Sequence, residues 1–192
     1  MKREKLNIRI NDRFLLGEID YSLHTVSMRY SFPDAINTLL FIEKVFTSHL
    51  NKRFRDKPHY LRSFVAKKYY PTLLELLRQK ELELREFYEA TKKESARMTH
   101  YREVYKVIEQ DNKSIELKVL ITPPVMLFIS IIAAVDNIIK QLRVQYKSGI
   151  ISKRHLYRQR NIVLKKFSNV RLVLYRLRKE HDELLEKILK IG

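Results

Sequence analysis

Apolar and polar residues alternate strictly in two segments that lie far apart in the chain. Over residues 5–11 the even positions are Leu or Ile, and the odd positions are Lys, Asn and Arg. Residues 114–122 place Ile, Leu and Val at odd positions, with mostly polar residues between them. An alternation with period two is typical of a strand with one buried face. The pattern therefore predicts two short strands, one near the N-terminus and one in the second half.

A third extended segment is predicted over residues 17–30. Ile19, Tyr21 and Leu23 alternate there with Glu, Asp and Ser, and the phase of the pattern changes near Thr25. An extra residue in a strand changes the face on which each following side chain lies. The change of phase therefore indicates a β-bulge.

Helical spacing of apolar residues accounts for most of the remaining chain. Pro33 suits the first position of a helix that runs to about residue 50, and a charged loop follows over residues 51–58. Pro71 starts or kinks another helix, which ends near Ser95. Residues 98–110 are compatible with helix or strand, and we expect a helix.

Two helices are predicted after the second strand. Thr122 and the two prolines that follow it are typical of a helix start, and this helix runs to about Ser148 before Gly149 ends it. Ser152 can cap the last helix, in which residues recur in steps of four and three. The members of this heptad seam are Val163, Phe167, Val170, Leu174, Leu177, His181, Leu184 and Ile188. We expect the seam to be packed, either inside the molecule or against a second chain.

These elements define the expected fold class, which is mainly α with a small β component. Residues 1–112 would hold the N-terminal strands and helices, and residues 113–192 a strand–helix–helix half. At 192 residues the chain is long enough for a real hydrophobic core, and we expect one compact domain overall.

The charge of the chain indicates which class of partner it binds. The formal net charge is +17, and residues 137–179 contain no Asp or Glu. A concentrated field of one sign attracts polyanions, nucleic acid first and anionic membrane second. Because apolar residues are interleaved, we expect a folded basic surface rather than a disordered tail. The thirteen cations of this acid-free stretch are Lys140, Arg143, Lys147, Lys153, Arg154, Arg158, Arg160, Lys165, Lys166, Arg171, Arg176, Arg178 and Lys179.

Several classes of protein are disfavoured by composition. The chain has no Cys and only three Gly, which argues against disulfides, thiolate chemistry and glycine-rich phosphate loops. Its six histidines show no metal-ligand spacing, and no nucleophile motif occurs. We therefore expect no enzyme, no cofactor and no metal. The N-terminus lacks an apolar signal region, so we expect a cytoplasmic location.

The most apolar run covers residues 125–135 and is about half as long as a bilayer span. Prolines precede this run, and Asp136 and Lys140 follow it. We therefore expect a buried core helix, and we regard a membrane segment as the weaker alternative.

The order of a strand, a helix opened by proline, a turn with glycine and a helix capped by serine over residues 114–167 resembles the ribbon–helix–helix DNA-binding fold. In that fold, strands from two subunits pair as a ribbon whose outward side chains contact base edges. The resemblance implies that Ser114, Glu116 and Lys118 point outward and that the helix start at residues 124–125 meets a phosphate. The strand over residues 5–9 is chemically the better candidate for base contacts, so the sequence leaves open which strand forms the ribbon.

The whole chain also resembles the AcaB-type transcriptional regulators of conjugative plasmids and integrative elements. The resemblance rests on residues 22–25 and 56–60 and on the block 115–167, with Ala134-Val135-Asp136 and residues 148–152 as its most telling parts. It implies a dimeric, DNA-binding activator of conjugative-transfer genes with a ribbon–helix–helix core.

The expected partner is double-stranded DNA, bound by a homodimer, with no small-molecule substrate. Two alternatives stay open: an accessory protein that binds DNA without sequence preference, and a protein of the anionic membrane surface. The candidate DNA-binding residues are Lys5, Asn7, Arg9, Lys113, Lys118, Lys153, Arg154 and Arg158.

Overall fold

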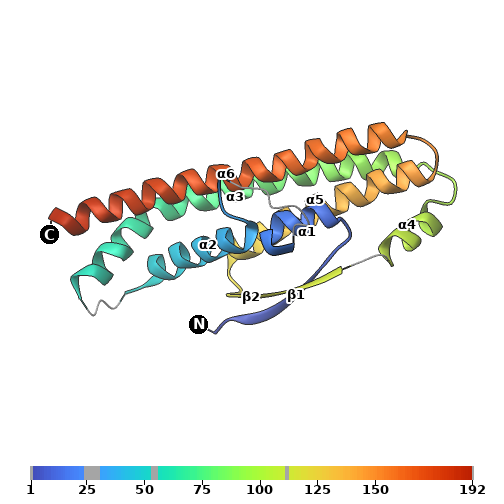
Figure 1. Cartoon of the computed structure of the whole chain (residues 1–192). Coiled ribbons are helices and arrows are strands. Elements are labelled where there is room, and N and C mark those ends of the chain that lie inside the picture. Colours follow the sequence, from blue (N-terminus) through green and yellow to red (C-terminus); the bar gives the residue numbers. More distant parts are fainter. Residues whose placement is uncertain (1, 24–30, 53–55, 111–112, 192) are drawn as a thin grey trace.

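Three long helices form an elongated bundle, which carries a two-stranded ribbon along one side (Figure 1). In this computed structural model, residues 2–23, 31–52, 56–110 and 113–191 are described. The long helices are α3 (Lys57–Ser95), α5 (Pro123–Lys147) and α6 (Lys153–Ile191). The predicted class, mainly α with a small β component, is confirmed.

Helix α5 is the central core element of the bundle. It is long and apolar enough to span a membrane, with a mean hydropathy of 1.8 over its most apolar window, but 67% of that window is buried inside the molecule. Thr122 stands at its N-cap and two prolines open it, as predicted. Its fully buried apolar side chains are Val125, Phe128, Ile131, Ile132, Val135, Ile138, Ile139 and Val144.

The heptad seam of α6 packs inside the bundle. Its members from Val163 to Leu177 are buried, and all of them belong to the same core cluster as α5. His181 is buried as well, and its ring lies edge-on to Phe41 and Tyr69, with ring centroids 5.9 and 5.6 Å apart. The predicted packing of the seam is therefore met within one chain as far as His181, whereas Leu184 and Ile188 are half-buried.

Shorter helices pack beside the bundle. They are α1 (Arg13–Ile19), a 3₁₀ turn (Tyr21–Leu23), α2 (Ala35–Leu50) and α4 (Tyr101–Glu109). The helices predicted near residues 33–50 and 98–110 are confirmed, although α2 starts at Ala35 because Asp34, and not Pro33, provides its N-cap.

The extended segment predicted over residues 17–30 is wrong where it can be compared. Residues 17–19 belong to α1, whose start is capped by Asp12. Leu15, Leu16 and Ile19 have helical spacing and are all buried, so capping and burial outweigh the short alternation that follows. The bulge predicted near Thr25, like residues 24–30 generally, lies outside the described residues.

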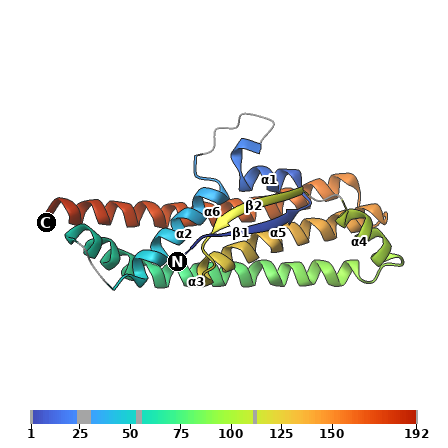
Figure 2. The same ribbon diagram turned by 90° about the horizontal axis from the view of Figure 1, so that it is seen from below.

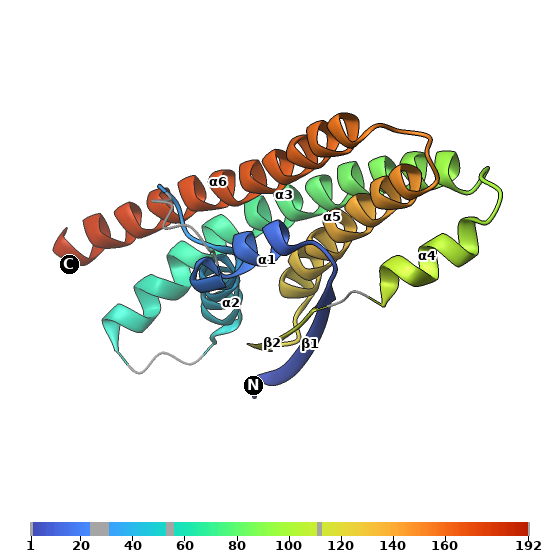
Figure 3. The ribbon, with the colours of Figure 1, turned by 45° about the vertical axis from the view of Figure 1, so that its right-hand side comes forward.

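The loop predicted over residues 51–58 is shorter than expected. Asp56 caps α3 by accepting a hydrogen bond from the backbone N–H of His59 at 2.8 Å, and Pro58 lies in the first turn. Pro71, predicted to start or kink a helix, lies inside α3, and the axis of α3 changes direction along its first half (Figure 3). The predicted end near Ser95 is confirmed.

The ribbon pairs β1 (Glu4–Ile10) with β2 (Lys113–Val119) in antiparallel orientation within one chain. Viewed from below, it lies across one face of the helices (Figure 2). Both predicted strands are confirmed. The resemblance implied a ribbon made by two subunits, whereas here residues 1–112 and 113–192 each supply one strand and share one hydrophobic core.

Candidate nucleic-acid interface

The outer face of the ribbon gathers polar side chains from two distant parts of the chain. Residues opposite each other in an antiparallel pair lie on the same face, and successive residues alternate between faces. The observed register pairs Lys5 with Lys118, Asn7 with Glu116, and Arg9 with Ser114, and all six residues are exposed. The opposite face carries Leu6, Ile8, Ile10, Ile115, Leu117 and Val119 toward the core.

One end of the ribbon is held to α5 by the buried carboxylate of Asp136. Its Oδ1 accepts the backbone N–H groups of Asn11 and Asp12 at 2.9 and 3.3 Å, and its Oδ2 accepts the Asn11 side-chain amide at 2.7 Å. Burial raises the pKa of Asp136, although these hydrogen bonds oppose the shift. Arg143 donates to the Asn11 carbonyl at 3.1 Å and completes the attachment.

The other end of the ribbon is held to α2 by Glu43, which is also buried. Its Oε1 accepts the backbone N–H of Leu120 at 2.6 Å, directly after β2. Its Oε2 lies 2.7 Å from the guanidinium of Arg3, directly before β1. Each end of the two-stranded ribbon is therefore fixed to a helix by a carboxylate that water does not reach. This attachment makes the ribbon a defined, preformed surface.

Charge on the outer face is mixed but predominantly positive. The ammonium of Lys5 lies 3.1 Å from the carboxylate of Glu116, so one cation is balanced on the face itself. Arg9 and Ser114 line a groove of about 530 Å³ whose other wall is α4, where Lys106 adds a cation and Glu109 an acid. The surface that a ligand would meet thus continues from the ribbon onto α4.

The cations predicted at the start of α6 lie elsewhere. Lys153, Arg154 and Arg158 are exposed in the first turns of α6, at the end of the bundle and away from the outer face of the ribbon (Figure 1). Ser152 caps this helix as predicted, its hydroxyl accepting the backbone N–H of His155 at 3.2 Å. The candidate DNA-binding residues therefore fall into two separate groups.

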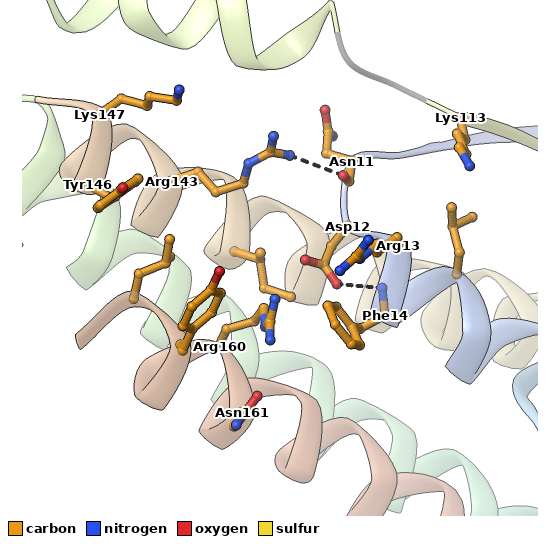
Figure 4. A pocket seen from close by; sticks show the side chains of 14 residues that line it. Asn11, Asp12, Arg13, Phe14, Lys113, Arg143, Tyr146, Lys147, Arg160 and Asn161 are labelled. Carbon is orange, nitrogen blue, oxygen red and sulfur yellow. Dashed lines mark hydrogen bonds between the residues drawn. The ribbon is translucent and has the colours of Figure 1, made fainter. Parts of the chain in front are cut away.

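Lys113 belongs to neither group. It pairs with Ile10, so it lies at the end of the ribbon, at a position that belongs to the inner face. There it lines a cavity between the end of the ribbon, α1, α5 and α6 (Figure 4).

The thirteen cations of the acid-free stretch do not form one continuous surface. Arg171 is fully buried, forms an ion pair with Glu18 and donates to the Tyr21 hydroxyl at 2.8 Å. Burial lowers the pKa of Arg171 to about 9, so its guanidinium remains charged at neutral pH. Lys140 is buried too, with its ammonium 5.5 Å from the centroid of the Tyr105 ring.

Other cations of the stretch meet acids from outside it. The ammonium of Lys166 lies 3.0 Å from Glu83 of α3, and Arg178 lies 3.5 Å from Asp182 one turn further along α6. The stretch is folded, as expected, but only part of its charge reaches the surface unpaired, because folding supplies acids that the local sequence lacks.

The local sequence does not reveal that two carboxylates, Asp136 and Glu43, position the ribbon. A signal existed for Asp136, which is an acid in the middle of an apolar helix and therefore needs buried donors. Glu43 interrupts the apolar positions of α2 in the same way. Their partners, at residues 3, 11–12 and 120, become visible only in the folded chain.

No cluster of three His, Cys, Asp or Glu side chains suited to a metal ion occurs among the residues that the structure describes. Comparison of the chain with models of protein families, with curated proteins and with solved structures found no match.

Proposed function

We propose that the chain is a sequence-specific DNA-binding transcriptional regulator that places the β1–β2 ribbon in the major groove. One observation carries the proposal: a ribbon attached at both ends presents polar side chains at alternate positions on its outer face. The major groove, about 12 Å wide, admits a two-stranded ribbon, and each base pair has a distinct donor and acceptor pattern there.

The chemistry of the outer face suits base recognition. Lys5, Arg9 and Lys118 can donate to the guanine O6 and N7, and Asn7 can form the paired hydrogen bonds that adenine offers. Glu116 opposes Asn7 in the register. A carboxylate on such a face is repelled by phosphate, but it can accept a hydrogen bond from the cytosine amino group.

The regulatory role and the assembly are parts of the same proposal. The resemblance to AcaB-type regulators supports an activator of conjugative-transfer genes that acts in the cytoplasm. Because one chain already forms a complete ribbon, a homodimer would place two ribbons on a palindromic operator, one at each half-site.

The decisive experiment is selection of bound sequences from a random duplex library, followed by binding titrations on the selected and scrambled duplexes at several salt concentrations. We expect a consensus sequence and a steep salt dependence, with a log–log slope of about −5 for six phosphate contacts. Absence of binding to any duplex at low salt would overturn the proposal.

A second candidate function is non-specific DNA binding by an accessory protein. The exposed cations at the start of α6 favour it, because they can contact phosphates without reading bases. Selection that yields tight binding but no consensus would favour this candidate over the regulator.

A further inference from the structure

A cavity of about 760 Å³ opens at the end of the bundle where β1 leads into α1. Its walls come from four places: the junction of β1 and α1, the first residue of β2, the C-terminal half of α5 and the first turns of α6 (Figure 4). Small-molecule sites in proteins typically have volumes of about 300–1,000 Å³. The cavity is therefore large enough for a ligand of the size of a nucleotide.

Five cationic side chains line this cavity, namely Arg13, Lys113, Arg143, Lys147 and Arg160. The one acid in the lining is Asp12, whose Oδ1 is engaged by the backbone N–H groups of Phe14 and Leu15 at 2.9 and 3.0 Å. Four of these cations, namely Arg13, Lys113, Lys147 and Arg160, form no ion pair with a carboxylate among the described residues. Like charges brought together without acids repel each other, and a bound anion would relieve that repulsion.

Arg160 is positioned by aromatic rings rather than by an acid. Its guanidinium carbon lies 4.1 Å from the ring centroid of Phe14 and 4.9 Å from that of Tyr157. Its Nε is buried and has no hydrogen-bond acceptor among the described residues. The two rings fix the direction of this guanidinium, so it is preorganised to donate to an anionic ligand.

The cavity also has an apolar component. Phe14 and Tyr157 remain 37% and 44% exposed, and the buried side chains of Leu16, Ile139 and Leu156 lie behind them. A purely inorganic anion would leave this surface without a partner. The lining therefore matches a ligand that combines several negative charges with a flat organic group.

We propose that this cavity binds a small molecule that carries several phosphate groups and a heterocyclic base, such as a nucleoside triphosphate. The proposal is independent of DNA recognition by the outer face of the ribbon, because none of the outward residues lines the cavity. The ligand would touch both strands at the same end of the ribbon, through Asn11 after β1 and Lys113 at the start of β2.

Isothermal titration calorimetry on the full-length protein at low salt tests the proposal, with ATP, pyrophosphate and adenosine as probes. We expect saturable binding of ATP, weaker binding of pyrophosphate and none of adenosine. Arg160→Gln should weaken ATP binding about tenfold, the effect of losing a charge-assisted hydrogen bond. Lys147→Gln should weaken it about threefold, because Lys147 is exposed at the cavity and is a flexible point charge.

The matched control is Lys165→Gln, which removes the same charge from an exposed lysine of α6 that does not line the cavity. It should leave ATP binding unchanged. If Arg160→Gln fails to fold by circular dichroism, the comparison of Lys147→Gln with Lys165→Gln decides. Equal weakening by both lysine substitutions would overturn the proposal, since it would show only the effect of net charge.

A third measurement distinguishes binding of a free small molecule from binding of the phosphates of DNA. Binding of duplex DNA that Lys147→Gln weakens, together with no heat from ATP or pyrophosphate at millimolar concentration, would overturn the proposal and assign these cations to the DNA backbone. Saturable ATP binding by a protein that binds no duplex would support the cavity proposal and remove the proposed regulatory function.

Discussion

The β1–β2 ribbon and the acid-free stretch over residues 137–179 present cationic side chains in opposite ways. The ribbon carries few charges, but alternation and register place them on one exposed face. The stretch carries thirteen, yet Arg171 and Lys140 are buried and Lys166 is paired with Glu83. The more charged segment in the sequence is therefore the more dispersed one in space.

The difference shows which part of each pattern is local. A strand pair needs only its register to gather alternate residues, and hydrogen bonds between backbones maintain that register. A long helix distributes its side chains around a full circle, so neighbouring helices decide which cations remain on the surface. Charge density along a helix is consequently a poor guide to the charge of a surface.

The sharpest test of this contrast is to remove the most deeply buried cation of the stretch. Arg171→Met removes the cation that pairs with the Glu18 carboxylate and the donor to the Tyr21 hydroxyl. Breaking a buried ion pair from one side costs about 3–5 kcal/mol, and we expect a loss of that size in the free energy of unfolding measured with urea. Arg176→Met, on the exposed side of the same helix, should change it by less than about 0.5 kcal/mol. Equal effects of the two substitutions would contradict the structural role of Arg171.

The free energy of unfolding should depend almost as strongly on the attachment of the ribbon. Asp136→Ala removes the acceptor of three N–H groups at the β1–α1 junction, and we expect it to lower the free energy of unfolding by about 3 kcal/mol. Asp136→Asn keeps one acceptor oxygen in place and should cost less. Urea unfolding of both variants measures the difference, and a ribbon that needs no anchor would show no loss for either one.

Substitutions on the outer face of the ribbon should change the affinity for DNA rather than the stability of the protein. Arg9→Ala and Lys118→Ala should each weaken binding to the selected sequence by about 1–3 kcal/mol and binding to scrambled DNA much less, because base contacts carry the specificity. Arg78→Ala, at an exposed position of α3, is the matched control and should alter neither. Fluorescence anisotropy with both duplexes measures the effect. Equal weakening on both duplexes would show that the ribbon does not read sequence.

The smallest effects should come from the start of α6. Lys153→Ala and Arg154→Ala remove exposed cations from the end of the bundle and should weaken selected and scrambled duplexes alike. Each should also flatten the salt dependence of binding by about one unit of log–log slope. Salt titrations by fluorescence anisotropy provide the measurement. Unchanged slopes would confine the DNA contact to the ribbon and α4.

The sequence predicts some secondary-structure elements of this protein correctly and others not. Periodicity and caps predict both strands, the helix opened by the prolines after Thr122 and the seam of α6. The structure confirms them. The segment before Thr25 was mispredicted, because a short alternation hid the cap at Asp12 and the buried helical triplet that follows it. Local signals succeed where a single pattern extends over many residues and fail where two patterns overlap within a few.

For the candidate site, the outward residues Lys5, Asn7, Arg9 and Lys118 followed from alternation alone, since a side chain in a strand can lie on only two faces. The sequence could not show that β1 and β2 join in one ribbon, because a pairing over more than a hundred residues depends on the packing of everything between them.

Local chemistry thus determined which residues form strands and helices and which strand residues share a face. Only the tertiary structure decided which carboxylates hold the ribbon, which cations lose their contact with water and where five cations meet around a cavity. The physical reason is that burial and ion pairing depend on distances between residues that are remote in sequence, and those distances are set when the helices pack together.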